Sequence, residues 1–224
     1  MDVFRIKAVV AAVALFVSGT ALADFGIGVK AGTLGLGVEG RWEPPVPWFD
    51  LRIGANQYEY AHEIKLSGID YDSNLLLDNY YLTGNLKFPA SPLRLTVGAY
   101  SNGNEVELYS RVPSGFELNV GGLTVPVADA GALRGTATFD KTAPYVGVGF
   151  DFEILGKAGV NFDFGVLWQD APIVELEATS WDELPPIVQD IVGPAIETER
   201  AELEDDLSAF KAWPVVSLSF VYNF

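Results

Sequence analysis

The sequence contains no cysteine and a single histidine, His62. Without cysteine the chain has no disulfide framework, no thiol nucleophile and no cysteine-ligated metal. Basic residues are also scarce: 14 lysines and arginines stand against 30 acidic residues, a net charge of −16. We expect no nucleic-acid partner, because neutralising phosphates requires lysine and arginine. The sequence also lacks a zinc-spaced cluster, a phosphate-binding loop and a nucleotide fingerprint, so we predict no cofactor.

The N-terminus has the three parts of a secretory signal peptide. Arg5 and Lys7 form a basic head, an apolar run extends from Ala8 to Val17, and Ala21-Leu22-Ala23 supplies the cleavage site. We therefore expect removal of residues 1–23, which leaves residues 24–224 as one domain with 12 basic and 29 acidic residues, a net charge of −17. No later run reaches the ~20 apolar residues of a transmembrane helix. Composition alone is also consistent with a soluble exported protein.

What the chain does have is alternation of apolar and polar residues in eight segments. Side chains of a strand point to opposite faces in turn, so each segment predicts a strand with one apolar face. The segments are 25–31, 36–42, 49–56, 80–88, 93–100, 146–154, 160–169 and 216–224.

The polar faces of these segments carry charges of both signs, whereas the apolar faces carry almost none. In a membrane barrel the apolar face meets lipid, where lysine or arginine at the midplane costs ~2–4 kcal/mol, and the polar face lines the lumen. Inside a narrow eight-stranded barrel the charged residues are expected to pair and to plug the lumen. This predicted charge network consists of Lys30, Glu39, Arg41, Asp50, Arg52, Lys87, Arg94, Asp151, Glu153 and Asp163.

The lengths of the connections separate a barrel from a soluble sandwich. The even-numbered connections are short and rich in Pro or Gly: EPPVP at 43–47, PASP at 89–92 and LGK at 155–157. Of the odd-numbered ones, only the first, near Gly32, is short; the others are SGIDYDSN and two stretches at about 110–141 and 180–212. Outer-membrane barrels combine short periplasmic turns with longer extracellular loops. The sequence therefore predicts an all-β, eight-stranded antiparallel up-and-down transmembrane β-barrel with a short helical segment in the last extracellular loop.

The final strand resembles the carboxy-terminal signature of bacterial outer-membrane proteins. The whole mature chain is similar to small eight-stranded barrels such as the OmpA transmembrane domain, OmpX and OmpW. Its segments KAGTLGLGVE, SGIDYD and AELEDDLSAFKAWPVVSLSFVYNF resemble a family of functionally uncharacterised proteobacterial outer-membrane proteins. The resemblance implies insertion by the barrel-assembly machinery into the outer membrane of a Gram-negative bacterium. We also expect a monomer in contact with lipid and lipopolysaccharide. The assembly signal is Val216, Leu218, Phe220, Tyr222 and Phe224.

Aromatic residues near the strand ends predict girdles at the two membrane interfaces. Trp42, Trp48, Phe88 and Tyr222 are expected in the lower girdle, with Tyr80, Trp168 and Trp213 in the upper one. Tyr100, Tyr109 and Phe116 are candidates for a small apolar site at the mouth of the barrel. The long loop near them is expected to form a hairpin that turns at Gly121-Gly122.

His62 is the candidate general base. Some barrels of this size modify lipid A with a histidine, a serine and an acidic residue, and Glu63, Ser67 and Ser110 are candidate partners. The sequence His62-Glu63-Ile64 does not reproduce the motifs of those enzymes. We therefore predict no catalytic residue and interpret His62 as a histidine at the rim.

Two acidic segments remain. Asp70 to Asn74 begins like a calcium loop, but Leu75 and Tyr81 stand where an EF-hand needs Gly and Glu, so we predict an Asx-rich turn and no metal site. In the last loop we expect a helix that opens at Pro185-Pro186, is interrupted at Gly193-Pro194 and is followed by a second helix. Apolar residues of that second helix recur at helical spacing: Ile196, Leu203, Leu207 and Phe210.

The acidic helix has two interpretations. Its apolar stripe packs on the barrel rim or on other loops, or the helix is a lid or a docking surface for a cationic partner. For the whole protein we expect a non-enzymatic outer-membrane barrel with a plugged lumen, whose acidic loops serve envelope structure or surface interaction. The alternatives are a narrow, porin-like channel that prefers cations and, less favoured, a lipid A-modifying enzyme that uses His62.

Overall fold

The computed structural model describes residues 24–46, 48–66, 69–110, 117–120, 123–126, 133–154, 156–179, 181–183 and 186–224. The barrel strands are β1 (Asp24–Gly32), β2 (Gly35–Glu43), β3 (Phe49–Leu66), β4 (Ile69–Lys87), β5 (Leu93–Asn102), β10 (Thr142–Glu153), β11 (Ala158–Trp168) and β13 (Ala212–Asn223). Above them lie β6 (Glu105–Ser110), β9 (Leu133–Thr138), β12 (Ile173–Ala178) and the hairpin of β7 (Glu117–Val120) and β8 (Leu123–Pro126). The helices are η2 (Trp181–Glu183), α2 (Pro186–Leu207) and η3 (Ser208–Lys211).

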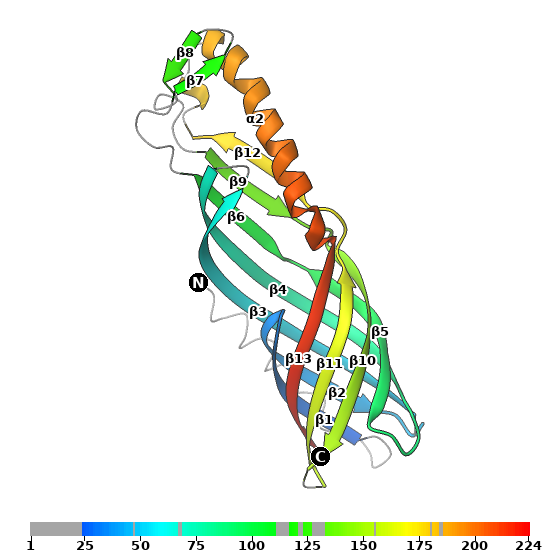
Figure 1. The fold of residues 1–224 in the computed structure, drawn as a ribbon. Helices are drawn as coiled ribbons and strands as arrows, with labels where there is room; N and C mark the ends of the chain where they lie inside the picture. Colours follow the sequence, from blue (N-terminus) through cyan, green and yellow to red (C-terminus); the bar gives the residue numbers. More distant parts are fainter. Residues whose placement is uncertain are drawn as a thin grey trace.

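The eight barrel strands form a closed antiparallel ring (Figure 1). Each strand pairs with its neighbours in the chain, and the ring closes where β1 pairs with β13, with Gly26 opposite Asn223. Each of the eight alternating segments falls in one of these strands, so the predicted fold class is confirmed. Closure satisfies the backbone groups that an open sheet edge would expose to lipid.

The short connections follow the prediction. The strands β2 and β3, β5 and β4, and β10 and β11 are joined at one end by short turns, and β1 turns directly into β2 at Thr33 and Leu34. The predicted hairpin in the long loop is confirmed by β7 and β8, with Val120 opposite Leu123. Residues 121 and 122 of its turn lie outside the described residues.

Beyond the barrel the wall continues on one side as an extension sheet, in the order β3, β4, β6, β9 and β12. The prediction that SGIDYDSN forms a loop is wrong, because residues 69–74 belong to β4 and pair with residues 61–66 of β3. Cross-strand pairing over this length outweighs the turn preference of Asp, Ser and Asn. The stretch from 133 to 138, predicted as loop, is likewise strand β9, which pairs with β6 and β12.

The last connection contains a 22-residue helix, α2, which lies along the extension sheet (Figure 1). It begins at Pro186 as predicted, but the predicted interruption at Gly193-Pro194 is wrong, because Pro194 lies inside a continuous helix. Proline removes one hydrogen bond to the residue four positions earlier. Asp190 and Pro194 are both exposed, so solvent can satisfy the carbonyl that loses its donor.

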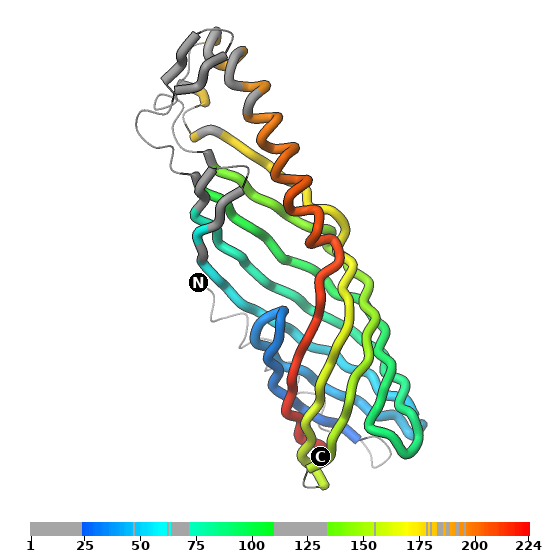
Figure 2. Tube along the Cα trace, in the orientation of Figure 1, coloured from blue at the N-terminus to red at the C-terminus, as the bar shows by residue number. Residues whose placement is uncertain are grey.

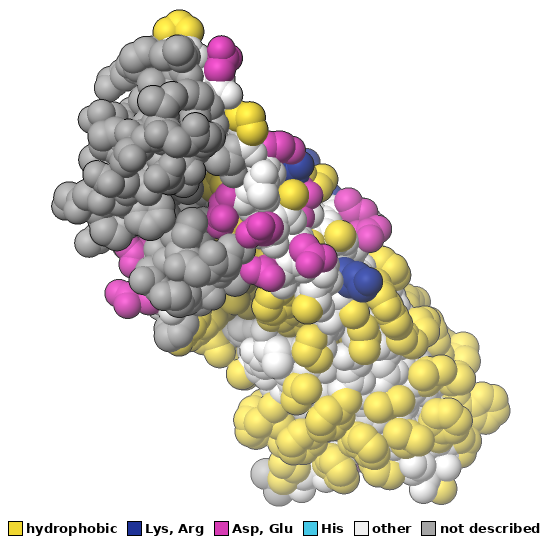
Figure 3. All heavy atoms as spheres, turned by 45° about the horizontal axis from the view of Figure 1, so that its top comes forward, with side chains coloured by type: hydrophobic (Ala, Val, Ile, Leu, Met, Phe, Trp, Pro, Cys, Tyr) yellow, Lys and Arg dark blue, Asp and Glu magenta, His cyan; other side chains and the backbone are white. Residues whose placement is uncertain are grey.

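Burial is inverted relative to a soluble protein. Arg52, Arg94 and Asp50 are 3%, 1% and 0% exposed, whereas Val29, Ile53 and Leu82 on the outside are 60%, 60% and 56% exposed. Hydrophobic side chains cover the outside of the barrel, and acidic side chains gather beyond them (Figure 3). This is the distribution that a lipid-facing barrel requires. No helix among the described residues is long and apolar enough to cross a membrane.

Candidate functional site

The barrel interior is the candidate functional site, and its lower part is an ion-pair cluster. Arg52 on β3 contacts Asp50 at 3.2 Å, Asp151 at 3.1 Å and Glu39 at 3.8 Å. Arg94 on β5 contacts Asp151 at 2.8 Å and also pairs with Asp163 on β11. Each guanidinium therefore bridges carboxylates from different strands of the barrel.

The remaining cations complete this cluster. Arg41 lies 3.5 Å from Asp50 and 4.0 Å from Asp151, and Lys87 lies 3.4 Å from Asp50. Lys30 contacts Asp163 at 3.8 Å. A buried charge is costly unless it is paired and hydrogen-bonded, and here the charges of both signs neutralise one another.

Nine of the ten residues of the predicted charge network thus lie together inside the barrel. Glu153 does not, because it is exposed at the end of β10 and no ion pair joins it to the described residues of the cluster. Its place at the rim is taken by Glu43, which the prediction missed and which contacts Lys87 at 2.8 Å and pairs with Arg41. Glu43 stands in the first turn motif, EPPVP, and was counted as part of that turn.

Glycine makes room for the largest interior side chains. A Cβ atom at Gly149 would overlap the guanidinium of Arg94, and one at Gly147 or Gly165 would overlap the ring of Tyr145. These glycines share the inward-facing parity of Asp151 and Asp163. Small residues opposite large ones allow eight strands to enclose an interior that side chains fill.

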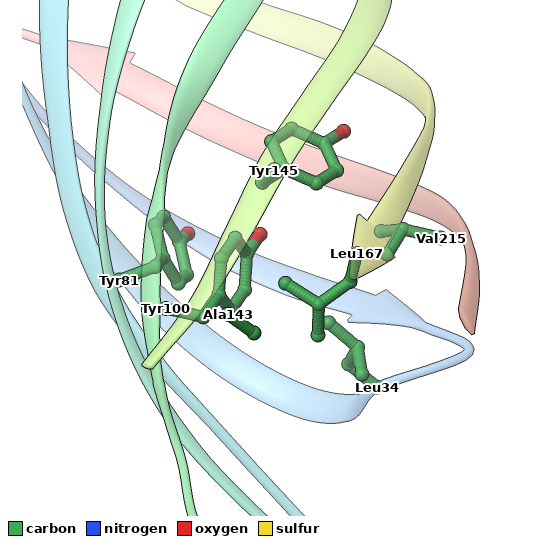
Figure 4. Close-up of a cluster of buried hydrophobic side chains, with 7 residues drawn as sticks. All are labelled: Leu34, Tyr81, Tyr100, Ala143, Tyr145, Leu167 and Val215. Atoms are coloured by element: carbon green, nitrogen blue, oxygen red, sulfur yellow. The ribbon is translucent and has the colours of Figure 1, made fainter. Parts of the chain in front are cut away.

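Above the cluster three tyrosines form a layer across the lumen (Figure 4). The rings of Tyr81 and Tyr100 stack at 5.0 Å between centroids, and the ring of Tyr145 lies 5.4 Å from that of Tyr100. The hydroxyl of Tyr81 donates to Glu39 Oε2 at 3.0 Å, and the ammonium of Lys30 lies 4.9 Å from the centre of the Tyr81 ring. The layer is completed by four buried apolar residues, Leu34, Ala143, Leu167 and Val215.

A layer of side-chain amides lies above the tyrosines and connects the barrel to the last loop. Asn102 and Asn104 donate to Gln169 Oε1 at 3.2 and 3.0 Å, and Asn79 donates to Asn104 Oδ1 at 2.8 Å. Gln169 Nε2 then donates to the carbonyl of Phe210, at 2.9 Å. Gln169 therefore joins the interior to the chain that leaves α2.

At the top, α2 packs on the inward face of the extension sheet. Leu203 and Leu207 are 0% and 4% exposed, and they contact four buried residues of β6, β9 and β12, which are Leu108, Ala137, Val174 and Leu176. Ile196 packs against the same cluster, whereas Phe210 is 42% exposed and contacts the ring of Trp213. The first interpretation of the acidic helix, packing of its apolar stripe on other parts of the chain, thus describes the contacts.

The described side chains therefore fill the interior in successive layers: ion pairs, tyrosines, amides and an aliphatic cluster under a helix. The sequence alternation placed Tyr81, Tyr100 and Gln169 on the inward face. It did not single out Tyr145, Asn79, Asn102 or Asn104. Continuing the same parity along each strand would have found them, because Tyr145 lies six residues before Asp151 on the same face.

Of the predicted candidates near the mouth, the two whose side chains are described, Tyr100 and Tyr109, do not lie together. Tyr100 is buried in the tyrosine layer, Tyr109 is 42% exposed on β6, and Phe116 lies outside the described residues. The backbone of His62 lies in β3 opposite Ser73. The side chains of His62 and Ser110, and all of Ser67, lie outside what the structure describes. Within the described part of the chain, no group of three or more His, Asp and Glu residues could hold a metal ion.

Most of the predicted girdle residues have exposed side chains, and their place at the membrane interfaces stays a prediction. The predicted girdle residues other than Trp213 are between 40% and 53% exposed. Trp213 differs, because its side chain packs against the inner apolar cluster that contains Leu34 and Val215. In the predicted assembly signal, Phe220 and Tyr222 are exposed on the outward face of β13, and Phe224 is exposed just beyond its end. The backbone amide of Phe224 donates to the carbonyl of Phe25 at 2.8 Å. Recognition of this strand during assembly remains a prediction.

Comparison with solved structures gives the same fold. The crystal structure of Acinetobacter baumannii CarO2 superposes with a TM-score of 0.60 at 20% identity, over 92% of this chain and all of that one. Acinetobacter baumannii CarO superposes with a TM-score of 0.54 at 20% identity, over 89% of this chain and 97% of that one. These likenesses support a small eight-stranded barrel and, at this identity, the fold alone. No protein-family model and no curated protein matches the chain.

Proposed function

We propose that this protein is a non-enzymatic barrel of the bacterial outer membrane with a plugged lumen and an acidic surface extension. The inverted burial supports the membrane location, since large apolar patches exposed to water are rare on soluble proteins. A lipid layer around Val29, Ile53 and Leu82 would remove the cost of their exposure. The short turns would then face the periplasm, and α2 would face the outside of the cell.

The observation that carries the plugged lumen is the set of ion pairs that cross it. Asp151 on β10 contacts Arg52 at 3.1 Å and Arg41 at 4.0 Å, although β2 and β3 lie on the far side of the ring from β10. These side chains meet at the middle of the barrel, where a channel would need water. The tyrosine and amide layers lie above them in series. The interior therefore serves to hold the walls together.

The surface role is assigned to the acidic extension. Glu197, Glu202, Asp205 and Asp206 are exposed on α2. A surface of this charge would attract cationic peptides and repel anionic lipopolysaccharide unless divalent ions bridge the two. Envelope stability and capture of cationic agents are the roles that fit this distribution. The same acids would concentrate cations if the lumen conducted, which is the one observation in favour of a cation-preferring channel.

A complementation experiment tests the surface role. A strain without the protein receives the wild type, a helix variant with Glu202→Gln, Asp205→Asn and Asp206→Asn, or a control variant with Asp24→Asn, Asp140→Asn and Glu153→Gln. Both variants lose three exposed acids, but only the first loses them on α2. We expect the wild type and the control to restore resistance to cationic peptides, and the helix variant to fail. Unchanged permeability, adhesion and peptide sensitivity in the deletion strain would refute the proposal.

A further inference from the structure

The hairpin of β1 and β2 is much shorter than the strands on either side of it (Figure 2). The last pair between β2 and β3 joins Leu36 to Gln57, yet β3 continues to Leu66. On the other side, β1 ends with Gly32 opposite Ser217, while β13 extends five residues further, to Ala212. Within the described residues the barrel wall therefore has a lateral notch above the β1–β2 turn.

A groove of about 360 Å³ occupies this notch. It is lined by the β1–β2 turn and by Ala31, Leu36, Tyr58, Tyr60, Leu75 and Leu77. Among the described residues no charged side chain lines it, in contrast to the interior a few residues lower. Its size is at the lower end of the ~300–1,000 Å³ range of ligand pockets.

The inner wall of the groove consists of two cross-strand pairs, Tyr58 with Leu77 and Tyr60 with Leu75. The tyrosine rings are stacked at 6.5 Å and are 45% and 49% exposed. They share the inward-facing parity of Arg52, so their faces would line the lumen if the wall were complete. Because the wall is incomplete, they face the notch.

The turn is shaped to leave these rings in place. Gly35 has a φ of +95°, which favours glycine, and a Cβ atom there would lie 2.5 Å from Cβ of Tyr58. The Thr33 hydroxyl donates to the carbonyl of Pro214 at 2.8 Å and accepts from the amide of Val216 at 3.1 Å. The hydroxyl of Thr33 is therefore hydrogen-bonded to β13, and the turn presents an apolar surface to the groove.

The groove opens on the surface that we propose to face lipid. Leu36, which lines it, is 63% exposed and lies on the same outward face as Val38, the cross-strand partner of Val29. Gly32 pairs with Ser217 of β13, and Ser217 pairs with Asp163 of β11. Asp163 lies five residues before Trp168, which we predict to be in the upper girdle. The notch therefore begins below the upper edge of the apolar belt, within reach of the outer lipid layer.

We propose that this groove binds a hydrocarbon chain of a membrane lipid, which enters sideways over the β1–β2 turn and lies against Tyr58, Tyr60, Leu75 and Leu77. The apolar lining selects the chain and not a charged headgroup. The continuity of the groove with Leu36 provides the path from the bilayer. This inference rests on the proposed membrane location, and the experiment below separates the two.

The absence of cysteine allows one fluorescent label to be placed at a time. Tyr60→Cys places it in the groove, and Leu82→Cys places it on the outward belt, where Leu82 is 56% exposed. Each labelled protein is refolded into vesicles of phosphatidylcholine that carries a nitroxide quencher on its acyl chain, and aqueous iodide serves as the second quencher. Circular dichroism confirms β-structure in each sample.

We expect the nitroxide chain to quench the label at Tyr60→Cys to within twofold of that at Leu82→Cys, and iodide to quench both weakly. If the nitroxide quenched only the Leu82→Cys label and iodide quenched the Tyr60→Cys label, the groove would not bind a lipid chain. The proposed membrane location would still hold. Failure of the nitroxide at both positions would overturn the membrane location as well.

A blocking variant tests entry over the turn. Ala31→Trp places a bulky ring at the outer lip of the groove, and Ala99→Trp places the same ring on the outward face of β5; both alanines are exposed. We expect Ala31→Trp to reduce nitroxide quenching at Tyr60→Cys at least twofold and Ala99→Trp to leave it unchanged. Equal quenching in the two variants would contradict entry at this lip.

Discussion

Arg52 of β3 and Asp151 of β10 form an ion pair at 3.1 Å across the interior of the barrel, although two strands separate β3 from β10 around the ring. Asp151 also accepts from Arg94 at 2.8 Å. A carboxylate shared by cations from different walls links those walls directly. The cluster therefore both occupies the lumen and ties the strands together, and its removal should weaken the barrel rather than simply open it.

Loss of a buried cation should destabilise the barrel strongly. Arg94 is 1% exposed and bonds Asp151, Asp163, Asn85 and Thr96. We expect Arg94→Met to lower the free energy of unfolding by ~3–5 kcal/mol, because each of the two carboxylates, Asp151 and Asp163, loses one of its cationic partners. Urea unfolding in lipid vesicles measures this. The control is Arg134→Met at an exposed position of β9, expected to change stability by less than ~0.5 kcal/mol; equal effects would contradict the account.

The hydroxyl of Tyr81 should stabilise the folded barrel through its hydrogen bond to Glu39. That carboxylate is 1% exposed and accepts from Tyr81 at 3.0 Å, and hydrogen bonds to charged groups contribute ~1.5–3 kcal/mol. Tyr81→Phe is therefore expected to destabilise the barrel by about that amount in the same assay. Tyr80→Phe removes a hydroxyl from the neighbouring outward residue, which is 40% exposed, and should have little effect. If Tyr81→Phe left the free energy of unfolding unchanged, the Glu39 carboxylate would have to be stabilised by other partners.

Glycine at position 149 should be required beneath Arg94. A Cβ atom there would overlap the guanidinium, so Gly149→Ala must displace a side chain that holds two carboxylates. Overpacking of this kind costs ~1–3 kcal/mol. Gly84→Ala is the matched control, because its Cβ would come no closer than 3.3 Å to the ring of Phe49 and 3.7 Å to the side chain of Leu51. Comparable unfolding midpoints for the two variants would argue against a tightly filled interior.

Docking of α2 should depend on Leu203, which is fully buried against the extension sheet. Leu203→Ala is expected to cost ~2–5 kcal/mol of docking free energy, so hydrogen exchange should accelerate in α2 and leave β13 and β11 protected. Glu202→Ala, at the exposed neighbouring position, provides the control and should preserve the exchange pattern. Uniform acceleration across the barrel would mean that helix and barrel unfold as one unit.

Much of this fold could be predicted because a barrel with an apolar outside and a polar inside repeats one rule along every strand. Period-two alternation located the eight strands, and the parity of charged residues located nine members of the cluster. Glu153 does not follow this rule because β10 ends at the rim, where water solvates the carboxylate in place of an ion partner. Glu43 was missed because a residue beside Pro44 and Pro45 has the local composition of a turn.

The extension could not be predicted in the same way, because its structure depends on contacts that are distant in sequence. Asp72, Ser73 and Asn74 have turn propensities, yet they pair with β3 and β6. Pro194 has the properties of a helix breaker, yet α2 continues through it because Leu203 and Leu207 dock on β6, β9 and β12. In both places tertiary packing overrides local preference.

The central claim is that the lumen is filled and does not conduct. Single-channel recording in a planar bilayer at several salt concentrations tests it most directly, with the refolded protein shown by circular dichroism to be β-structure and an open porin as the positive control. The account predicts no discrete openings at any salt concentration. Reproducible cation-preferring openings of the wild-type chain would contradict it and would favour the channel instead.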